Sequence, residues 1–211
     1  MFANITSFSI KAFNIFASMN ILIVSATNKE SYSSKSFNFE SLITGIGIAN
    51  TMSNLTPYLI KSNYDFLINI GICGSFDRSY NLGDVVEVNE DCFSELGYED
   101  GDEFRLFDNH DEINQFFKFE SKTHLDTVKG ITVNTVHGND QSIDKVVKQF
   151  NPIVESMEGA ACMMLAKAFR MPMIQLRGIS NYVEERDRDN WEVGLAIRNL
   201  HVELEKILEK L

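Results

Sequence analysis

The sequence predicts a single α/β domain, and three observations support this prediction. Short β-branched runs such as 20–26 (NILIVSA) and 66–70 (FLINI) are typical of buried strands. They alternate with helical segments, of which 160–170 (AACMMLAKAFR) is apolar nearly all round, as in a buried helix. Polar residues come directly after several of the strands, which is where open α/β sheets bind ligands.

Composition narrows the possible functions. A chain of 211 residues has room for one domain with a substantial core. Its net charge of −11 repels phosphate backbones, so we expect no nucleic-acid partner. The three cysteines, Cys73, Cys92 and Cys162, lack metal-type spacing. Reduced thiols in a cytoplasmic protein are the simplest interpretation.

Residues 1–18 (MFANITSFSIKAFNIFAS) are treated separately. Their one Lys and scattered Phe and Ile faintly suggest a targeting peptide, but polar residues interrupt every apolar stretch. No stretch is long enough for a membrane span. We expect a disordered tail or an upstream start at 1–18, and a single domain at 19–211.

The amino-terminal half gives two strands and a helix. The strand at 20–26 leads into Thr27–Glu30, where Glu30 is either a solvated loop residue or a functional carboxylate. A second strand at 39–44 ends in Thr-Gly-Ile-Gly, which lacks the third glycine of a dinucleotide loop. A helix should span 48–61, and Pro57 should kink or restart it.

The remaining elements follow in order. The strand at 66–70 ends in a predicted glycine turn at 71–75, and a further strand covers 83–88. Residues 91–114 are acidic and aromatic and predict a surface excursion. Next come a strand at 130–134, a helix from Ser142 or Asp144 to Phe150, a strand at 173–176, and an amphipathic helix within 191–211.

Several motifs together resemble the nucleoside phosphorylase/nucleosidase superfamily. They are 44–47 (TGIG), the Asn-x-Gly-x-x-Gly pattern at 69–74, 155–159 (ESMEG) and 177–181 (RGISN). The resemblance implies a three-layer αβα sandwich with a central mixed sheet, and no metal or organic cofactor. It also implies roles for individual residues. Glu30 polarises the attacking water, and Asn181 contacts the purine base. The ribose is held by Met157 and Glu158, and the residues beside the sugar are Thr44, Gly71 and Ile72.

Longer sequence segments narrow the resemblance to one family within the superfamily. The segments 95–102 (ELGYEDGD), 132–140 (TVNTVHGND) and 179–184 (ISNYVE) are similar to the futalosine hydrolase family within that superfamily. This similarity implies cleavage of futalosine to hypoxanthine and dehypoxanthine futalosine, a step toward menaquinone. It also implies a cytoplasmic homo-oligomer whose partner is a small-molecule nucleoside.

The residue types favour a 6-oxopurine as the leaving base and water as the nucleophile. Adenine-releasing members of the superfamily place Asp after Ile-Ser, where an acid protonates nitrogen 7. Asn181 cannot deliver a proton, but its amide can donate to a 6-oxygen while its carbonyl accepts from a protonated nitrogen 7. The resemblance implies that phosphorolytic members of the superfamily hold phosphate with arginines, several of them from the amino-terminal half. No arginine precedes Arg78 here, so a phosphate nucleophile would be poorly held.

Some alternatives stay open. The aryl carboxylate of futalosine needs an aromatic wall and cations, for which the candidates are Phe93, Tyr98, Tyr182, Arg186 and Arg188. Glu158 taken alone could simply cap a helix. A methylthioadenosine/S-adenosylhomocysteine nucleosidase and a catalytically silent nucleoside-binding module are the rival functions.

Overall fold

The computed structural model describes residues 19–101, 103–107 and 115–211, so the tail expected at 1–18 lies outside the described residues. The strands are β1 (Ile21–Ser25), β2 (Phe39–Ile43), β3 (Phe66–Ser75), β4 (Val85–Cys92), β5 (Gly97–Asp100), β6 (Glu103–Leu106), β7 (Phe116–Lys118), β8 (Thr127–Thr132), β9 (Val154–Ser156) and β10 (Met173–Tyr182). The helices are α2 (Ile48–Lys61), α3 (Asp140–Phe150), α4 (Gly159–Ala168), α5 (Val193–Leu208) and the short 3-10 helix η1 (Arg188–Asn190).

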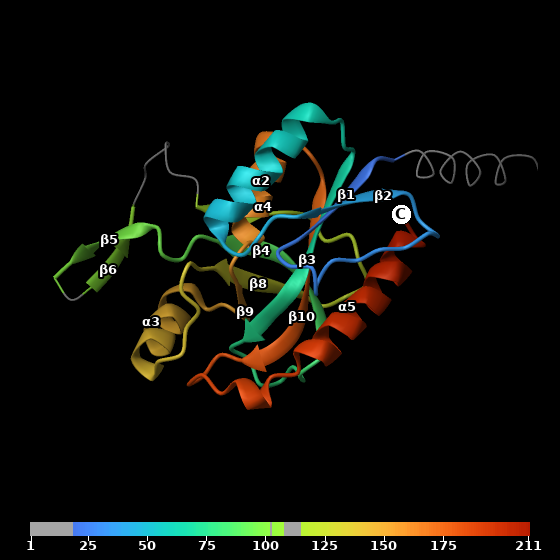
Figure 1. Ribbon diagram of the computed structural model, residues 1–211. Helices are drawn as coiled ribbons and strands as arrows, with labels where there is room; N and C mark the ends of the chain where they lie inside the picture. The colour runs from blue at the N-terminus through green and yellow to red at the C-terminus, as the bar shows by residue number, and fades with distance from the viewer. Residues whose placement is uncertain (1–18, 102, 108–114) are drawn as a thin grey trace, which may run out of the picture.

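One mixed sheet organises the described part of the chain (Figure 1). Its order is β10-β4-β8-β9-β3-β1-β2, with β7 beside β4, while β5 and β6 form a separate hairpin. The long strands β3 and β10 also pair with each other in parallel, which closes β10, β4, β8, β9 and β3 into a ring. The predicted α/β fold with a central mixed sheet is confirmed.

Alternating side chains divide the core between the two faces of the sheet. Ile23 of β1 packs with Leu204 of α5 on one face. Leu22, the preceding residue, packs with Leu55 of α2 and Met163 of α4 on the other. Figure 1 shows α2 and α4 together on one side and α5 on the other, as the predicted three-layer arrangement requires. No helix in the described ranges is both long and apolar enough to cross a membrane.

Two predicted strand ends are wrong. The glycine segment 71–75 is not a turn, because β3 continues through it to Ser75. The segment 177–181 likewise lies inside β10 rather than beyond it. β3 and β10 satisfy each other's backbone hydrogen-bonding groups along these segments. Their parallel pairing runs from Leu67 opposite Met173 to Ser75 opposite Tyr182.

Smaller differences have local causes. Helix α3 begins before Ser142, because the side chain of Asn139 caps it by accepting the backbone N–H groups of residues 141 and 142. Pro57 lies inside one continuous α2, so the helix does not restart there. The segment predicted as a surface excursion completes β4 and forms the β5–β6 hairpin, and β7 was not predicted.

A buried polar cluster lies between the sheet and the beginning of α4. Asp91 of β4 accepts hydrogen bonds from the Gln175 amide at 3.0 Å and the Thr132 hydroxyl at 3.0 Å. The same hydroxyl accepts the backbone N–H of Ala160 at 2.7 Å. Burial raises the pKa of Asp91 to about 6, against the lowering effect of those two hydrogen bonds. The cluster therefore fixes the first turn of α4 to β4, β8 and β10.

Gly159 is the position at which this cluster tolerates no side chain. A Cβ there would lie 2.2 Å from the Asp91 carboxylate and 2.3 Å from the Gln175 amide. We expect Gly159→Ala to lower the free energy of unfolding by about 1–3 kcal/mol, measured by urea denaturation. Gly194→Ala is the matched control at the beginning of α5, since among the described residues its Cβ would meet only the exposed Arg198, at 3.3 Å. Equal effects of the two substitutions would contradict the packing described.

Asp91 should make stability depend on pH. Because its folded pKa of about 6 exceeds its ordinary 3.8, its contribution is fully present below pH 3.8 and is lost as pH rises through about 6. This difference corresponds to roughly 3 kcal/mol. We expect Asp91→Asn to remove it, so that wild type gains stability relative to the variant between pH 7 and pH 4. Gln175 Oε1, which has no hydrogen-bond partner among the described residues, can rotate to accept from the new amide. Parallel pH profiles of unfolding free energy would show the prediction to be wrong.

Candidate active site

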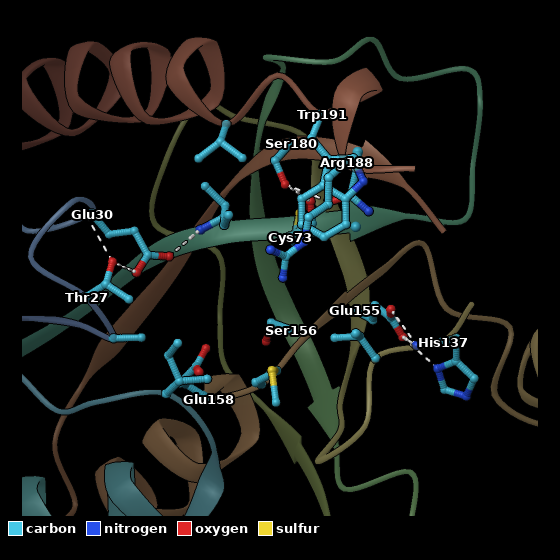
Figure 2. A pocket seen from close by; sticks show the side chains of 18 of the residues that line it. Thr27, Glu30, Cys73, His137, Glu155, Ser156, Glu158, Ser180, Arg188 and Trp191 are labelled. Carbon is cyan, nitrogen blue, oxygen red and sulfur yellow. Dashed lines mark hydrogen bonds and ion pairs between the residues drawn. The ribbon is translucent and has the colours of Figure 1, made fainter. Parts of the chain in front are cut away.

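A cavity of about 700 Å³ lies where the loop after β1, the later halves of β3 and β10, the segment after β8, the residues that lead from β9 into α4, and the first turns of α5 meet. Figure 2 shows Glu30, Glu158, His137 and Trp191 around it. One cavity thus collects groups from both ends of the chain. The predicted site residues that line it are Ile72, Met157, Asn181, Tyr182, Arg186 and Arg188, together with Glu30 and Glu158.

Glu30 is buried in the turn after β1 with its carboxylate fixed at both oxygens. Oε2 accepts the Thr27 hydroxyl at 2.6 Å, and Oε1 accepts the backbone N–H of Ile72 at 3.1 Å. The backbone carbonyl of Glu30 lies 2.9 Å from Nε2 of His201 on α5. Ile72 therefore acts through its backbone, and the carboxylate is held on the cavity wall in one orientation.

Glu158 stands at the N-terminus of α4 without capping it through its side chain. Its Oε1 instead accepts the backbone N–H of Gly47 at 2.8 Å, which joins α4 to the beginning of α2. Burial is the main cause that raises the pKa of Glu158; the charge of Arg177 and the Gly47 hydrogen bond oppose this rise. Met157, beside it, also lines the cavity. The simple helix-cap interpretation of Glu158 is therefore wrong.

Asn181 lies on β10, opposite Gly74 of β3. Its Oδ1 accepts the Ser180 hydroxyl at 2.8 Å, and its Nδ2 donates to the carbonyl of Tyr182 at 3.0 Å. A Cβ at Gly74 would lie 3.1 Å from Nδ2, so the glycine leaves room for the amide. One N–H and one lone pair of the side chain remain available to a ligand.

Other predicted residues lie away from the cavity lining. Thr44 is buried, with its hydroxyl 3.3 Å from the carbonyl of Ser25. Gly71 is a buried residue of β3. Phe93 packs edge-to-face on Phe117 at 5.6 Å between ring centroids, and Tyr98 belongs to the separate hairpin. The cavity lining, as far as the structure describes it, does not include Thr44, Gly71, Phe93 or Tyr98.

Arg177 is a buried charge that sequence reasoning treated only as part of a motif. Its Nη2 donates to Asn69 Oδ1 at 2.5 Å and its Nη1 to the carbonyl of Leu176 at 3.1 Å. A Cβ at Gly71 would lie 3.3 Å from Nη1 and 3.1 Å from the Glu30 carboxylate. The small residue at 71 thus lets a buried cation and a cavity carboxylate approach the same space.

Sequence reasoning missed other lining residues, among them His137, Glu155 and Trp191. His137 Nδ1 lies 2.6 Å from the buried carboxylate of Glu155, which also accepts the backbone N–H of His137 at 3.1 Å. Trp191 lines the cavity at the end of the loop after β10. The phrase TVNTVHGND carried the signal for His137, but nothing in the sequence paired it with Glu155.

The cavity can therefore offer acceptors on one wall and an amide on another. Glu30 and Glu158 supply carboxylates, and Asn181 supplies a donor and an acceptor together. No group of three or more His, Cys, Asp or Glu side chains suited to a metal ion occurs among the described residues.

Comparison with known proteins identifies the family. A model of the Phosphorylase superfamily matches residues 41–211. The futalosine hydrolase of Thermus thermophilus is 24% identical over 186 residues, which cover 82% of this chain and 83% of the relative. A 5′-methylthioadenosine/S-adenosylhomocysteine nucleosidase of Buchnera aphidicola is 24% identical over 171 residues, which cover 75% of this chain and 73% of the relative.

The fold comparison agrees. The structure of a futalosine hydrolase mutant of Helicobacter pylori matches with a TM-score of 0.78 at 14% identity, covering 92% of this chain and all of that one (100%). The relatives are nucleosidases of two specificities, and the chain is as similar to one as to the other. The predictions of the superfamily and of an enzyme of the nucleosidase class are confirmed. The chain belongs to the Phosphorylase superfamily.

Proposed function

We propose that the protein hydrolyses the N-glycosidic bond of futalosine, releasing hypoxanthine and dehypoxanthine futalosine on the route to menaquinone. The observation that supports this best is that Asn181 lines the same cavity as Glu30 and Glu158. The carboxylates suit hydrolysis of a nucleoside, and the amide suits a 6-oxopurine. The proposal includes a cytoplasmic location, in keeping with three buried free cysteines, and a homo-oligomer.

Glu30 activates the nucleophile. Its two hydrogen bonds, from Thr27 and from the Ile72 backbone, hold the carboxylate in place before any ligand arrives. A water beside it gives up a proton to the carboxylate while its oxygen forms a bond to the sugar C1′ and the bond from C1′ to the base nitrogen breaks. A fixed base of this kind avoids reorganisation during the reaction.

Glu158 and Met157 hold the ribose. The Glu158 carboxylate can accept hydrogen bonds from sugar hydroxyls and also lies near the positive charge that develops on the sugar ring. The backbone of Gly47 fixes one of its oxygens at 2.8 Å, which orients the carboxylate toward the cavity. The side chain of Met157 supplies an apolar contact surface from the same turn.

Asn181 recognises the leaving base. Its amide donates to the 6-oxygen of hypoxanthine, and its carbonyl accepts from nitrogen 7, which takes its proton from solvent water before the bond to C1′ breaks. A 6-amino group in the same place would set donor against donor, which costs on the order of a few kcal/mol in a buried site. The arrangement therefore favours hypoxanthine over adenine.

Water is the proposed nucleophile rather than phosphate. Phosphorolysis needs cations around a doubly charged oxyanion. Ile72, at the place where phosphorolytic relatives have a hydroxyl, offers only an apolar side chain to the cavity. Arg177 is engaged with Asn69 below the cavity lining. Arg186 and Arg188 belong to the loop after β10, and Figure 2 shows Arg188 across the pocket from Glu158, away from the place proposed for the ribose.

The second candidate is a methylthioadenosine/S-adenosylhomocysteine nucleosidase, because relatives of that kind are equally similar.

We expect the protein to release hypoxanthine from futalosine, and to act at least tenfold more slowly on aminodeoxyfutalosine and methylthioadenosine. Chromatographic identification of the released base measures this directly. Rapid adenine release from methylthioadenosine would overturn the assignment.

Glu30→Gln separates an enzyme from a silent binding module. We expect the substitution to lower kcat by about 100-fold or more while the Kd for futalosine, measured by calorimetry, changes only a few-fold. Glu209→Gln, an exposed substitution at the end of α5, is the matched control and should leave both values unchanged. Full turnover by Glu30→Gln would refute the role of this carboxylate.

Asn181→Asp should shift the preference toward adenine. The atom that now donates to the carbonyl of Tyr182 becomes an oxygen, which favours a protonated carboxyl able to protonate nitrogen 7. We expect the ratio of adenine release to hypoxanthine release, compared as kcat/KM, to rise about tenfold or more. Asn181→Ala is the control and should slow both reactions without reversing the preference. An unchanged ratio for Asn181→Asp would show that this side chain does not read the base.

A further inference from the structure

The loop that leaves β10 turns alternate charged residues toward the cavity. Glu184, Arg186 and Arg188 line it, whereas Glu185 and Asp187 are not among the lining residues described. Asp187 is used within the loop, because its carboxylate accepts from the backbone N–H of residue 189 and the amide of residue 190. Glu185 and Asp187 therefore do not neutralise the arginines of this loop at the cavity surface.

Charge pairing leaves two guanidinium groups at the rim. Glu184 forms an ion pair with Arg78, whose guanidinium also lies 4.6 Å from the centroid of the Tyr182 ring. Arg186 and Arg188 form no ion pair within the part of the chain that the structure describes. In a protein of net charge −11, two uncompensated cations beside a cavity favour an anionic ligand group.

An aromatic and apolar surface adjoins these cations. The guanidinium carbon of Arg186 lies 5.1 Å from the centroid of the Trp191 ring, within cation–π range. Val193 and Ile197, on the first turns of α5, line the cavity next in sequence. The backbone N–H of Glu192 donates to the carbonyl of Ser180 at 2.8 Å, which fixes this wall to β10. The surface suits a flat aromatic group that carries a negative charge.

The opposite wall is less suited to such a group, because two carboxylates there outweigh the single exposed cation of Lys29. Glu30 and Glu158 bear their carboxylates there, and Figure 2 shows Glu158 across the pocket from Arg188 and Trp191. In a ribose, the 2′ and 3′ hydroxyls and the 5′ carbon occupy different edges of the ring. A sugar whose hydroxyls meet Glu158 therefore directs its 5′ substituent away from Glu158, toward the loop.

We propose that Arg186, Arg188 and Trp191 form a subsite for an anionic aryl group on the 5′ position of the nucleoside. This inference rests on the proposed function and names the part of the protein that selects among nucleosides by their tails. The arginines contact the carboxylate, and the indole ring contacts the aryl plane. A neutral thioether tail would leave both cations without a partner.

Futalosine and inosine provide the test, since they share the base and ribose and differ at the 5′ position. In a Glu30→Gln background, calorimetry should show futalosine binding at least tenfold more tightly than inosine. Arg186→Ala and Arg188→Ala should each reduce this preference by about 3- to 10-fold and leave inosine binding unchanged. Arg198→Ala, an exposed substitution on α5 that is absent from the described lining, is the matched control. Rising salt should also weaken the preference.

The outcomes separate the subsite from the reaction. Equal loss of futalosine and inosine binding in the arginine variants, or an unaltered preference, overturns the subsite, even if the wild type releases hypoxanthine. A tail preference that these arginines control supports the subsite even if no base is released, in which case only the proposed reaction fails. Base release that requires inorganic phosphate and is abolished by Arg186→Ala or Arg188→Ala overturns both, because the arginines would then hold the nucleophile.

Discussion

The parallel pairing of β3 with β10 is the constraint on which the candidate site depends. It begins at Leu67 and Met173 and continues to Ser75 and Tyr182, well past the apolar portion of either strand. This continuation places the Ile72 backbone where it holds Glu30, and sets Gly74 opposite Asn181. A carboxylate from the amino-terminal part of the chain and an amide from the carboxyl-terminal part meet because these two strands are neighbours.

A buried cation and buried carboxylates lie beneath that pairing. Arg177, Asn69 and Gln175 project toward α4 from positions where the same strands otherwise bury apolar side chains. Burying charge is unfavourable unless partners compensate, and here the guanidinium lowers the pKa values of both Asp91 and Glu158 while burial raises them. The polar cluster thereby fixes the turn that carries Met157 and Glu158.

The proposed specificity of this cavity divides into separable contributions. In the proposed complex the ribose meets Glu158, the base meets the amide of Asn181 on β10, and the 5′ group meets the loop that follows β10. Because the last two lie within a few residues of each other, changes in one short segment can alter base and tail recognition without altering the sheet.

Local chemistry in the sequence determined the strand cores, both ends of helix α2, and the family, because hydrophobic periodicity and short motifs are local signals. It also identified Glu30, Glu158 and Asn181, which one cavity brings together.

The sequence did not determine the ends of β3 and β10, or the pairing of His137 with Glu155. Nor did it determine that Thr44, Gly71 and Phe93 lie away from the cavity lining. Those features depend on which strands are neighbours and which backbone groups they satisfy. Only the tertiary structure decides that, because the partners lie far apart in the chain.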